Sequence, residues 1–331
     1  MNPPAAPARP AGDVLGERMR RKHDALYNHP DVWLYRKSHG VHSVVAGALH
    51  AELGGVAVLE VGCGAGRLSL LCAQRARHVH GFDFSERAVQ IARLNAAAVG
   101  ADNASFSVDD PHTYFDREQE RFGVILMCGI LEHAPDPAQV LAMARRHLEP
   151  GGVVVASCPG FINWRGASYM TLATLLGLPM SLADLRQVGA EDVDRWALSV
   201  GLRRERTLGA IYDFAWGGKA VRDLARRVPA AASDADLEQP LDFDRYADWL
   251  SAHEEYWKGF LARLEAAGLL RRITRPVELV PRHRGHVDDG LWSKMCGYLG
   301  EDIVSDPYYS DEEPFCHLGG ETIYLLRAVD T

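Results

Sequence analysis

The sequence has few cysteines, and none of them forms a paired motif. Six cysteines occur in 331 residues, at scattered positions, without a Cys-x-x-Cys pair. A secreted disulfide scaffold or a cysteine-rich zinc module needs denser and more regular spacing. Residues 1–14 are rich in Pro and Ala and lack the apolar stretch of a secretion signal, so they predict a disordered tail. We therefore expect free thiols and a cytoplasmic protein.

The sequence also lacks a long apolar run and an excess of positive charge. The best candidate for a membrane span, 169–182, is interrupted by Gly177 and Pro179 and is shorter than the roughly 18 residues that a bilayer requires. Lys and Arg number 36 against 44 Asp and Glu, which gives a formal net charge of −8. Nucleic-acid backbones are bound by clustered cations. We therefore expect neither stable membrane insertion nor a nucleic-acid partner.

The order of the expected elements predicts an α/β fold. Short apolar runs predict buried strands at 56–61, 78–82, 105–108, 123–127 and 153–156. Segments with helical spacing lie between them, at 67–76, 85–98 and 137–148. This alternation predicts βαβ units and a doubly wound, Rossmann-like parallel sheet. Two further strands, at 204–213 and 321–326, would complete a seven-stranded sheet.

The remaining segments predict additions around this sheet. Aromatic residues concentrate in a long amphipathic stretch, 243–270, far from the glycine-rich part of the chain. We expect five units: a disordered tail (1–14), an N-terminal helical lid (15–55), a Rossmann-like domain (56–215), a mostly helical cap (216–318) and the final strand of the sheet (319–331).

A glycine loop follows the first expected strand and is the strongest local signal. In VLEVGCGAG, glycines at alternate positions (Gly62, Gly64 and Gly66) let the backbone approach a ligand closely. A dinucleotide fingerprint would need glycine where Arg67 stands, and the GK[ST] of a P-loop is absent. The pattern therefore favours a ligand without a pyrophosphate, and S-adenosylmethionine (SAM) is such a ligand.

Five motifs in order resemble the class I SAM-dependent methyltransferases. They are VLEVGCGAG, GFDFS, the Asp109-Asp110 pair, LEHAPDP and LEPGG, and the resemblance covers about residues 56–215 together with the final strand. Within that class, the sequence looks like the ubiquinone/menaquinone-biosynthesis-type and bacterial natural-product methyltransferases. The resemblance implies SAM as cofactor and S-adenosyl-L-homocysteine (SAH) as product.

The resemblance implies roles for the residues around the ribose and the methionine. Glu60, at the end of the first strand, would organise the loop and meet the methionine amine. Asp83 would accept both ribose hydroxyls, and a carboxylate suits two such donors. Phe84 would pack on the adenine. Gly62, Gly64 and Gly66 would bring the backbone close to the cofactor.

Further residues would border the two ends of the cofactor. In the family, the position after the third strand receives the adenine amino group; here that is Asp109 or Asp110, and the register favours Asp110. Cys128 and Gly129 would line the sulfonium end with their backbone. Cys63 is interpreted as a small filler between two glycines and not as a nucleophile.

Tyr35, His39 and His133 are the candidates for taking a proton from the acceptor. Tyr35, His39 and His42 are separated by four and three residues, so they share one face of a helix. We expect Tyr35 or His39, with His133 opposite, to contact the acceptor or the methionine end of SAM. A buried stripe would give the same spacing, and His133 could instead orient its own loop.

The aromatic residues outside the glycine-rich domain favour a small, flat acceptor. Trp249, Trp257 and Trp292 are among them, and an apolar cavity could use part of the set. We therefore expect a methyltransferase for an aromatic or indole-type specialised metabolite, with O, N or C as the methylated atom. A quinone- or lipid-precursor methyltransferase and a non-catalytic SAM/SAH-binding sensor are the alternatives. The oligomeric state, including a homo-oligomer, stays open.

Two other chemistries have weaker support. Amino-methylating nucleic-acid enzymes carry a [DNS]PP[YFW] tetrapeptide after the fourth strand, where this chain reads Met127-Cys-Gly-Ile130. Cys158 could be a cytosine-C5 nucleophile, but the Pro-Cys pair that would accompany it is missing. Possible metal ligands lie in loops without helical spacing, so we expect no metal; they are His283, His286, Asp288, Asp289, Cys316 and His317.

Overall fold

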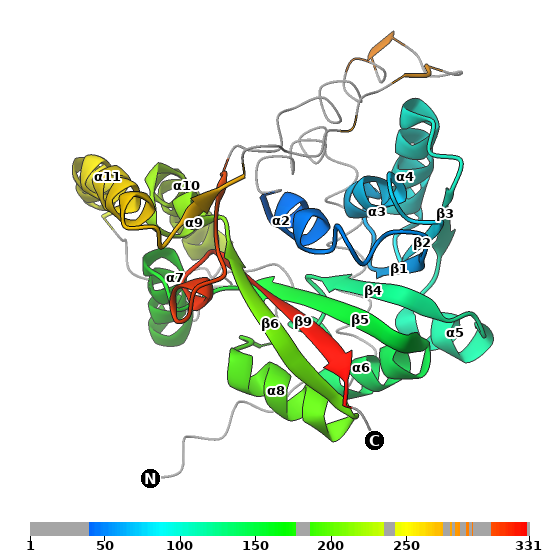
Figure 1. The fold of residues 1–331 in the computed structure, drawn as a ribbon. Coiled ribbons are helices and arrows are strands. Elements are labelled where there is room, and N and C mark those ends of the chain that lie inside the picture. Colours follow the sequence, from blue (N-terminus) through cyan, green and yellow to red (C-terminus); the bar gives the residue numbers. More distant parts are fainter. Residues whose placement is uncertain are drawn as a thin grey trace.

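A computed structural model shows a nine-stranded mixed sheet with helices on both faces (Figure 1). It describes residues 40–176, 186–234, 242–273, 279, 282–284, 289–290, 293 and 306–329. Tyr35, His39, Trp292 and most of the expected N-terminal lid lie outside the described residues.

The sheet confirms the Rossmann-like prediction and adds two strands to it. Its order is β3-β2-β1-β4-β5-β9-β6-β8-β7. Strands β1 to β5 are parallel, and β9 runs antiparallel between β5 and β6. The strands are β1 (Ala57–Val61), β2 (His78–Asp83), β3 (Ala104–Val108), β4 (Phe122–Cys128), β5 (Leu148–Pro159), β6 (Leu202–Ala210), β7 (Arg271–Arg272), β8 (Tyr308–Ser310) and β9 (Glu321–Ala328). The expected count of seven was wrong because the short β7 and β8 extend the sheet at the β6 edge.

Helices cover both faces of this sheet, as Figure 1 shows. Alternate residues of β1 enter two different cores: Leu59 packs with α5, α6 and α8, whereas Val58 packs with α2 and α3. Burial on both faces explains why all of β1 is apolar except Glu60. The helices are α2 (Gly40–Ala48), α3 (Arg67–Ala73), α4 (Glu86–Val99), α5 (Pro111–Arg117), α6 (Pro137–Arg146), α7 (Trp164–Leu176), α8 (Ala190–Ser199), α9 (Tyr212–Trp216), α10 (Gly218–Asp234) and α11 (Phe243–Ala266).

Local chemistry explains where several elements begin and end. The Ser85 hydroxyl accepts the Ala88 N–H and caps α4, as predicted. The expected sixth strand was too long, because Ile211 adopts φ 52° and ends the extended chain. Tyr212 then begins the short helix α9. The sequence analysis also missed α5, which Asp110 caps ahead of Pro111.

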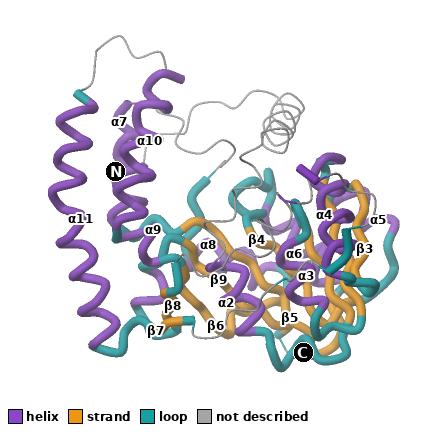
Figure 2. The backbone as a smooth tube through the Cα atoms, turned by 90° about the horizontal axis from the view of Figure 1, so that it is seen from above, coloured by secondary structure: helices purple, strands orange, loops and turns teal. Residues whose placement is uncertain are grey.

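Helices α7, α10 and α11 form a group at one end of the sheet (Figure 2). They share a small apolar cluster in which Leu224 and Leu250 are buried and Trp164 packs from α7. The boundaries of the expected cap remain a prediction. Although α11 has 24 residues, no helix in the described part of the chain is both long and apolar enough to cross a membrane.

Candidate active site

The carboxyl ends of the parallel strands meet at one edge of the sheet. The strand order reverses between β1 and β4, whose neighbours β2 and β5 lie on opposite sides of them. In open α/β sheets, ligands bind in the crevice outside the strand ends at such a switch point. The glycine loop leaves β1 there and leads into α3.

The glycines of this loop are required by its backbone geometry. Gly62, Gly64 and Gly66 have φ values of 70°, 52° and 77°, in the left-handed region that favours glycine. A Cβ on Gly66 would lie 2.9 Å from both Ala92 Cβ and Phe106 Cζ, and one on Gly62 would collide with the Ile130 side chain. Cys63 is buried between the glycines, and burial raises the pKa of its thiol. The thiol is therefore protonated and poorly suited to act as a nucleophile.

Asp83 at the end of β2 connects the loop to the second strand. Its Oδ2 accepts the Gly64 N–H at 2.9 Å, and its Oδ1 accepts the Ser85 N–H at 2.9 Å. A carboxylate oxygen can accept more than one hydrogen bond. A buried carboxylate oriented by two backbone amides therefore fits a ribose diol, and the half-buried Phe84 follows it directly.

Glu60 lies buried beneath the loop at the end of β1. Its Oε2 accepts the Ser69 N–H at 2.8 Å and also the Ser69 hydroxyl, so it stabilises the first turn of α3. Burial raises the Glu60 pKa to about 8, the nearby Asp83 charge raises it further, and the Ser69 hydrogen bonds oppose the shift. An ammonium group at this place would compensate a buried carboxylate, so Glu60 fits the amine of a SAM methionine.

The two consecutive aspartates after β3 differ in their contacts. Asp110 Oδ1 accepts the N–H groups of His112 and Thr113 at 3.0 and 3.1 Å, and so caps α5. The Asp109 N–H donates to the Asp83 carbonyl at 3.1 Å, and its carboxylate pairs with Arg117 at 2.7 Å. Asp110 thus caps α5, whereas Asp109 links β3 to β2, and the preference for Asp110 at the adenine remains a prediction.

The end of β4 contributes backbone and a buried acid. Gly129 follows Cys128 with φ 71°, and its N–H donates to the Ser157 carbonyl at 3.0 Å. Glu132 is buried, and its Oε1 lies 3.9 Å from His133 Nε2. The His133 side chain is 22% exposed, so it can reach solvent or a ligand at this edge.

Sequence reasoning missed two residues at the same edge, Ser157 and Glu321. The Ser157 hydroxyl donates to Glu321 Oε1 at 2.8 Å. Glu321 begins β9, and because β9 is antiparallel, its first residue lies where the parallel strands end. The position of the final strand was predicted, and its direction in the sheet was the missing information.

His42 lies in α2 near Arg67, the first residue of α3, and the possible metal ligands His286 and Asp288 lie outside the described residues. Burial and the Arg67 charge lower the pKa of His42 to about 3, so it is neutral in α2. Cys316 and His317 come together with Glu313, and His317 Nε2 lies 3.0 Å from Glu313 Oε2. The expectation that the protein needs no metal remains a prediction.

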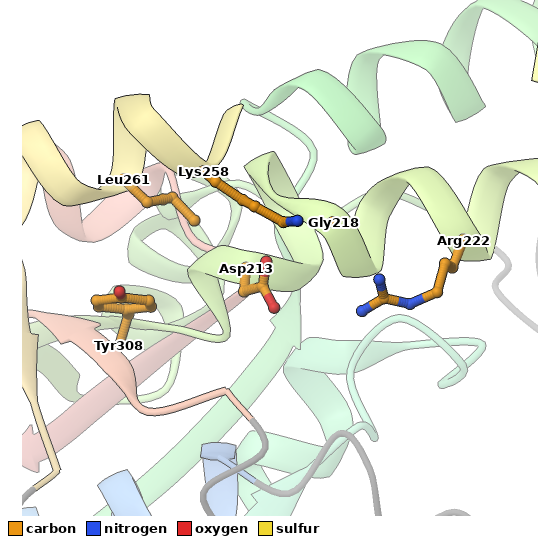
Figure 3. Close-up of a pocket in the computed structure, with 6 residues that line it drawn as sticks. All are labelled: Asp213, Gly218, Arg222, Lys258, Leu261 and Tyr308. Carbon is orange, nitrogen blue, oxygen red and sulfur yellow. The ribbon is translucent and has the colours of Figure 1, made fainter. Parts of the chain in front are cut away.

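A cavity of about 220 Å³ lies among α9, α10, α11 and β8. Figure 3 shows Asp213, Lys258 and Tyr308 around it. Glu254 pairs with both cations beside this cavity, Arg222 and Lys258, at 3.3 Å each. The charges around the cavity are already compensated, since Asp213 pairs with Lys219 at 3.6 Å.

Comparisons with known proteins identify a family and several relatives of this chain. The model of a family described as "Methyltransferase domain" matches residues 53–187. The ubiquinone biosynthesis O-methyltransferase of Alkalilimnicola ehrlichii is 33% identical over 171 residues, which cover 49% of this chain and 66% of that protein. The protein of the same name from Thiobacillus denitrificans is 32% identical over 169 residues, covering 49% and 71%. The chain thus spans about two thirds of the length of these curated relatives.

Solved structures are also similar. The magnesium protoporphyrin IX methyltransferase of Synechocystis PCC 6803, crystallised with bound SAH, has 19% identity and a TM-score of 0.41, covering 60% of this chain and 82% of that one. Together with the family match, the Thiobacillus denitrificans relative shows that the chain belongs to the class I SAM-dependent methyltransferases, with SAM as its cofactor.

Proposed function

We propose that the chain transfers a methyl group from SAM to a hydroxyl group of a small aromatic acceptor. One observation supports this most strongly: the glycine loop and the buried Asp83 carboxylate are joined at the switch point of the sheet. The relatives are named O-methyltransferases, which favours oxygen among the acceptor atoms that the sequence left open.

The cofactor residues would act mainly by positioning. SAM supplies an electrophilic methyl group on its sulfonium when bound. Asp83 would hold the ribose, Phe84 would pack on the adenine, and Glu60 would face the methionine amine. The backbone of Cys128 and Gly129 would border the reacting end. Holding donor and acceptor in line supplies much of the acceleration of such a displacement.

Aromatic side chains of α7, α9 and α11 support a flat acceptor. Trp257 stacks on Trp164 with ring centroids 5.1 Å apart, and its ring lies 5.8 Å from that of Trp216. The Trp257 Nε1 is buried, and no atom in the described part of the chain accepts a hydrogen bond from it. Aromatic walls with an available donor are suited to a planar, polar-tipped molecule.

The acceptor would be either a specialised metabolite or a quinone precursor. The sequence analysis favoured the metabolite, and the names of the relatives support the quinone precursor. Both can offer an aromatic hydroxyl group. A SAM or SAH sensor would bind the cofactor without turnover and would have no need for the aromatic cluster.

Calorimetry with SAM tests the cofactor part of this proposal. Asp83→Ala should weaken SAM binding by about 1.5–3 kcal/mol, because hydrogen bonds to a charged group are lost. Asp83→Asn keeps the size of the side chain and removes its charge. Comparison with Asp83→Ala then separates the effect of the charge from that of the side-chain shape. Asp136→Ala is the matched control, since Asp136 caps α6 through the Gln139 N–H. NAD should not bind.

Turnover on a panel of phenols, amines and indoles tests the acceptor part. Methylated product and SAH, detected by mass spectrometry, should form with phenols. Unchanged SAM affinity in both Asp83 variants would contradict the cofactor assignment. Tight SAM binding without product from any acceptor would instead favour the sensor.

A further inference from the structure

The order of the strands determines the side from which an acceptor approaches. This step rests on the proposed function, in which Asp83 on β2 holds the ribose. The nucleoside then occupies the β2 and β3 side of the switch point, and the methionine with its sulfonium extends towards β4. Beyond β4 lie β5, β9 and β6. The acceptor must therefore reach the methyl group from the side of β5 and β9.

Glu321 is an acidic residue on that side. It pairs with Pro159 of β5 and Ala210 of β6, so it lies level with the ends of both strands. Ser157 is 1% exposed, and its hydroxyl holds Glu321 Oε1 at 2.8 Å. Ser157 also lies opposite Cys128 in the β4–β5 register. The buried Ser157 thus connects the Glu321 carboxylate to the end of β4, which would border the sulfonium.

Two thiols on which the Glu321 charge acts, those of Cys128 and Cys158, are poor proton acceptors. On β4 and β5, burial raises the pKa of the Cys128 and Cys158 thiols, and the carboxylate charges of Glu321 and Glu132 raise them further. Both thiols are therefore neutral near pH 7. Glu132 is 3% exposed, whereas Glu321 is only partly buried. On the β6 side, Glu321 pairs with the apolar Ala210. Glu321 is thus the more accessible of these two acids.

The segment before Glu321 connects the sheet edge to the aromatic cluster. The Trp216 indole N–H donates to the Leu318 carbonyl at 2.7 Å, and the Asn163 side-chain amide donates to the Gly319 carbonyl at 2.9 Å. Asn163 immediately precedes Trp164, which stacks on Trp257. These two contacts fix the backbone just before Glu321. The same segment connects β9 to the helices that carry the aromatic rings.

We propose that Glu321 is a catalytic residue that receives the hydroxyl proton of the aromatic acceptor. The acceptor oxygen forms a bond to the methyl carbon while the carbon–sulfur bond breaks, and that electron pair remains on sulfur as a neutral thioether. The O–H bond breaks, and its proton passes to the Glu321 carboxylate and then to water. Ser157 is a positioning residue that orients the carboxylate.

Two catechols of different acidity test this assignment. Wild-type protein and Glu321→Gln are assayed with SAM and either catechol or 4-nitrocatechol, with SAH measured by mass spectrometry. Because general-base catalysis contributes about 10²–10⁴-fold, Glu321→Gln should lower kcat with catechol by at least about 100-fold. With 4-nitrocatechol, whose hydroxyl ionises without help near neutral pH, the loss should be less than about tenfold.

Controls separate this role from folding and from cofactor binding. Glu149→Gln makes the same change near the opposite end of β5 and should leave both rates unchanged. SAM affinity of Glu321→Gln should stay within about twofold of wild type, and Glu321→Asp should recover part of the catechol rate. If Glu321→Gln fails to fold, Ser157→Ala should show the same preference for the nitrocatechol with a smaller loss.

Three results would overturn the inference. The first is an equal loss on both catechols, which indicates a binding role. The second is a catechol rate that does not change in Glu321→Gln. The third is a wild-type protein that binds SAM and methylates neither catechol, which leaves the cofactor assignment intact. A wild-type protein that does not bind SAM would instead contradict the proposed function itself.

Discussion

The two parts of this edge that we propose for the cofactor and for the acceptor are built in different ways. On the cofactor side, Glu60, the glycine loop and Asp83 lie within one βαβ unit, and backbone amides hold the key carboxylate. On the acceptor side, Ser157 and Glu321 are 164 positions apart and meet only through strand pairing. The geometry of the proposed cofactor site therefore depends on local backbone shape, whereas that of the proposed acceptor site depends on tertiary structure.

The largest expected effect comes from replacing two glycines by alanine, one in the glycine loop and one in α11, the helix that carries Trp257. In Gly66→Ala, the new Cβ meets Ala92 and Phe106 at 2.9 Å in a left-handed conformation. Overpacking costs about 1–3 kcal/mol and the left-handed backbone about 1–2 kcal/mol more. In Gly259→Ala, within α11, the nearest atom is the end of the Arg263 side chain at 3.4 Å. That variant should gain about 0.5–1 kcal/mol, because alanine favours a helix.

Urea unfolding of the two glycine variants measures this contrast. Gly66→Ala should unfold at lower urea, and Gly259→Ala at the same or higher urea than wild type. Equal shifts in both variants would show that the glycine loop tolerates a side chain and would break the comparison.

A smaller effect is expected in the pH dependence of stability. The folded-state pKa of Glu60 is raised from 4.5 to about 8, and that of Asp306, which is buried beside α9, from 3.8 to about 6. A raised acid pKa means that the folded state binds the proton more tightly. The stability that this proton binding contributes is fully present below the pKa of the unfolded state. It is lost as pH rises through the pKa of the folded state.

Urea unfolding between pH 4 and 9, without cofactor, separates the two acids. Wild-type stability should fall, on the order of a few kcal/mol for Glu60, between pH 4.5 and 8. Glu60→Gln should remove the slope above pH 6 and reduce it below pH 6, whereas Asp306→Asn should reduce the slope only below pH 6. If stability still falls above pH 6 in Glu60→Gln, the pH dependence comes from another group and not from Glu60.

The smallest expected effect concerns a tryptophan of the acceptor side. Trp257→Leu removes the ring that stacks on Trp164 and should raise the KM for catechol several-fold, with SAM affinity unchanged within about twofold. Trp196→Leu, on α8 beneath the sheet, is the matched control and should leave the KM for catechol unchanged. A change in SAM affinity without a change in the catechol KM would contradict the assignment of Trp257 to the acceptor.

The sequence predicted local features well because their signals are local. A short apolar run and the glycines that follow it were sufficient to place β1, and an N-cap at Ser85 needs only its own side chain and the next turn. The preference for Asp110 rested on register, and only the structure shows that this carboxylate caps α5. Glu321 could not be found in this way, because its neighbours depend on the direction of β9.

Strand β9 also sets the order in which this protein can fold during synthesis. It is made last but lies in the interior of the sheet, paired on one side with β5 and on the other with β6. At typical rates of translation, the ribosome needs roughly 5–20 s to extend the chain from Ala210 to Glu321. Throughout that interval, β5 and β6 present unpaired backbone edges, a state that favours chaperone binding over early closure of the sheet.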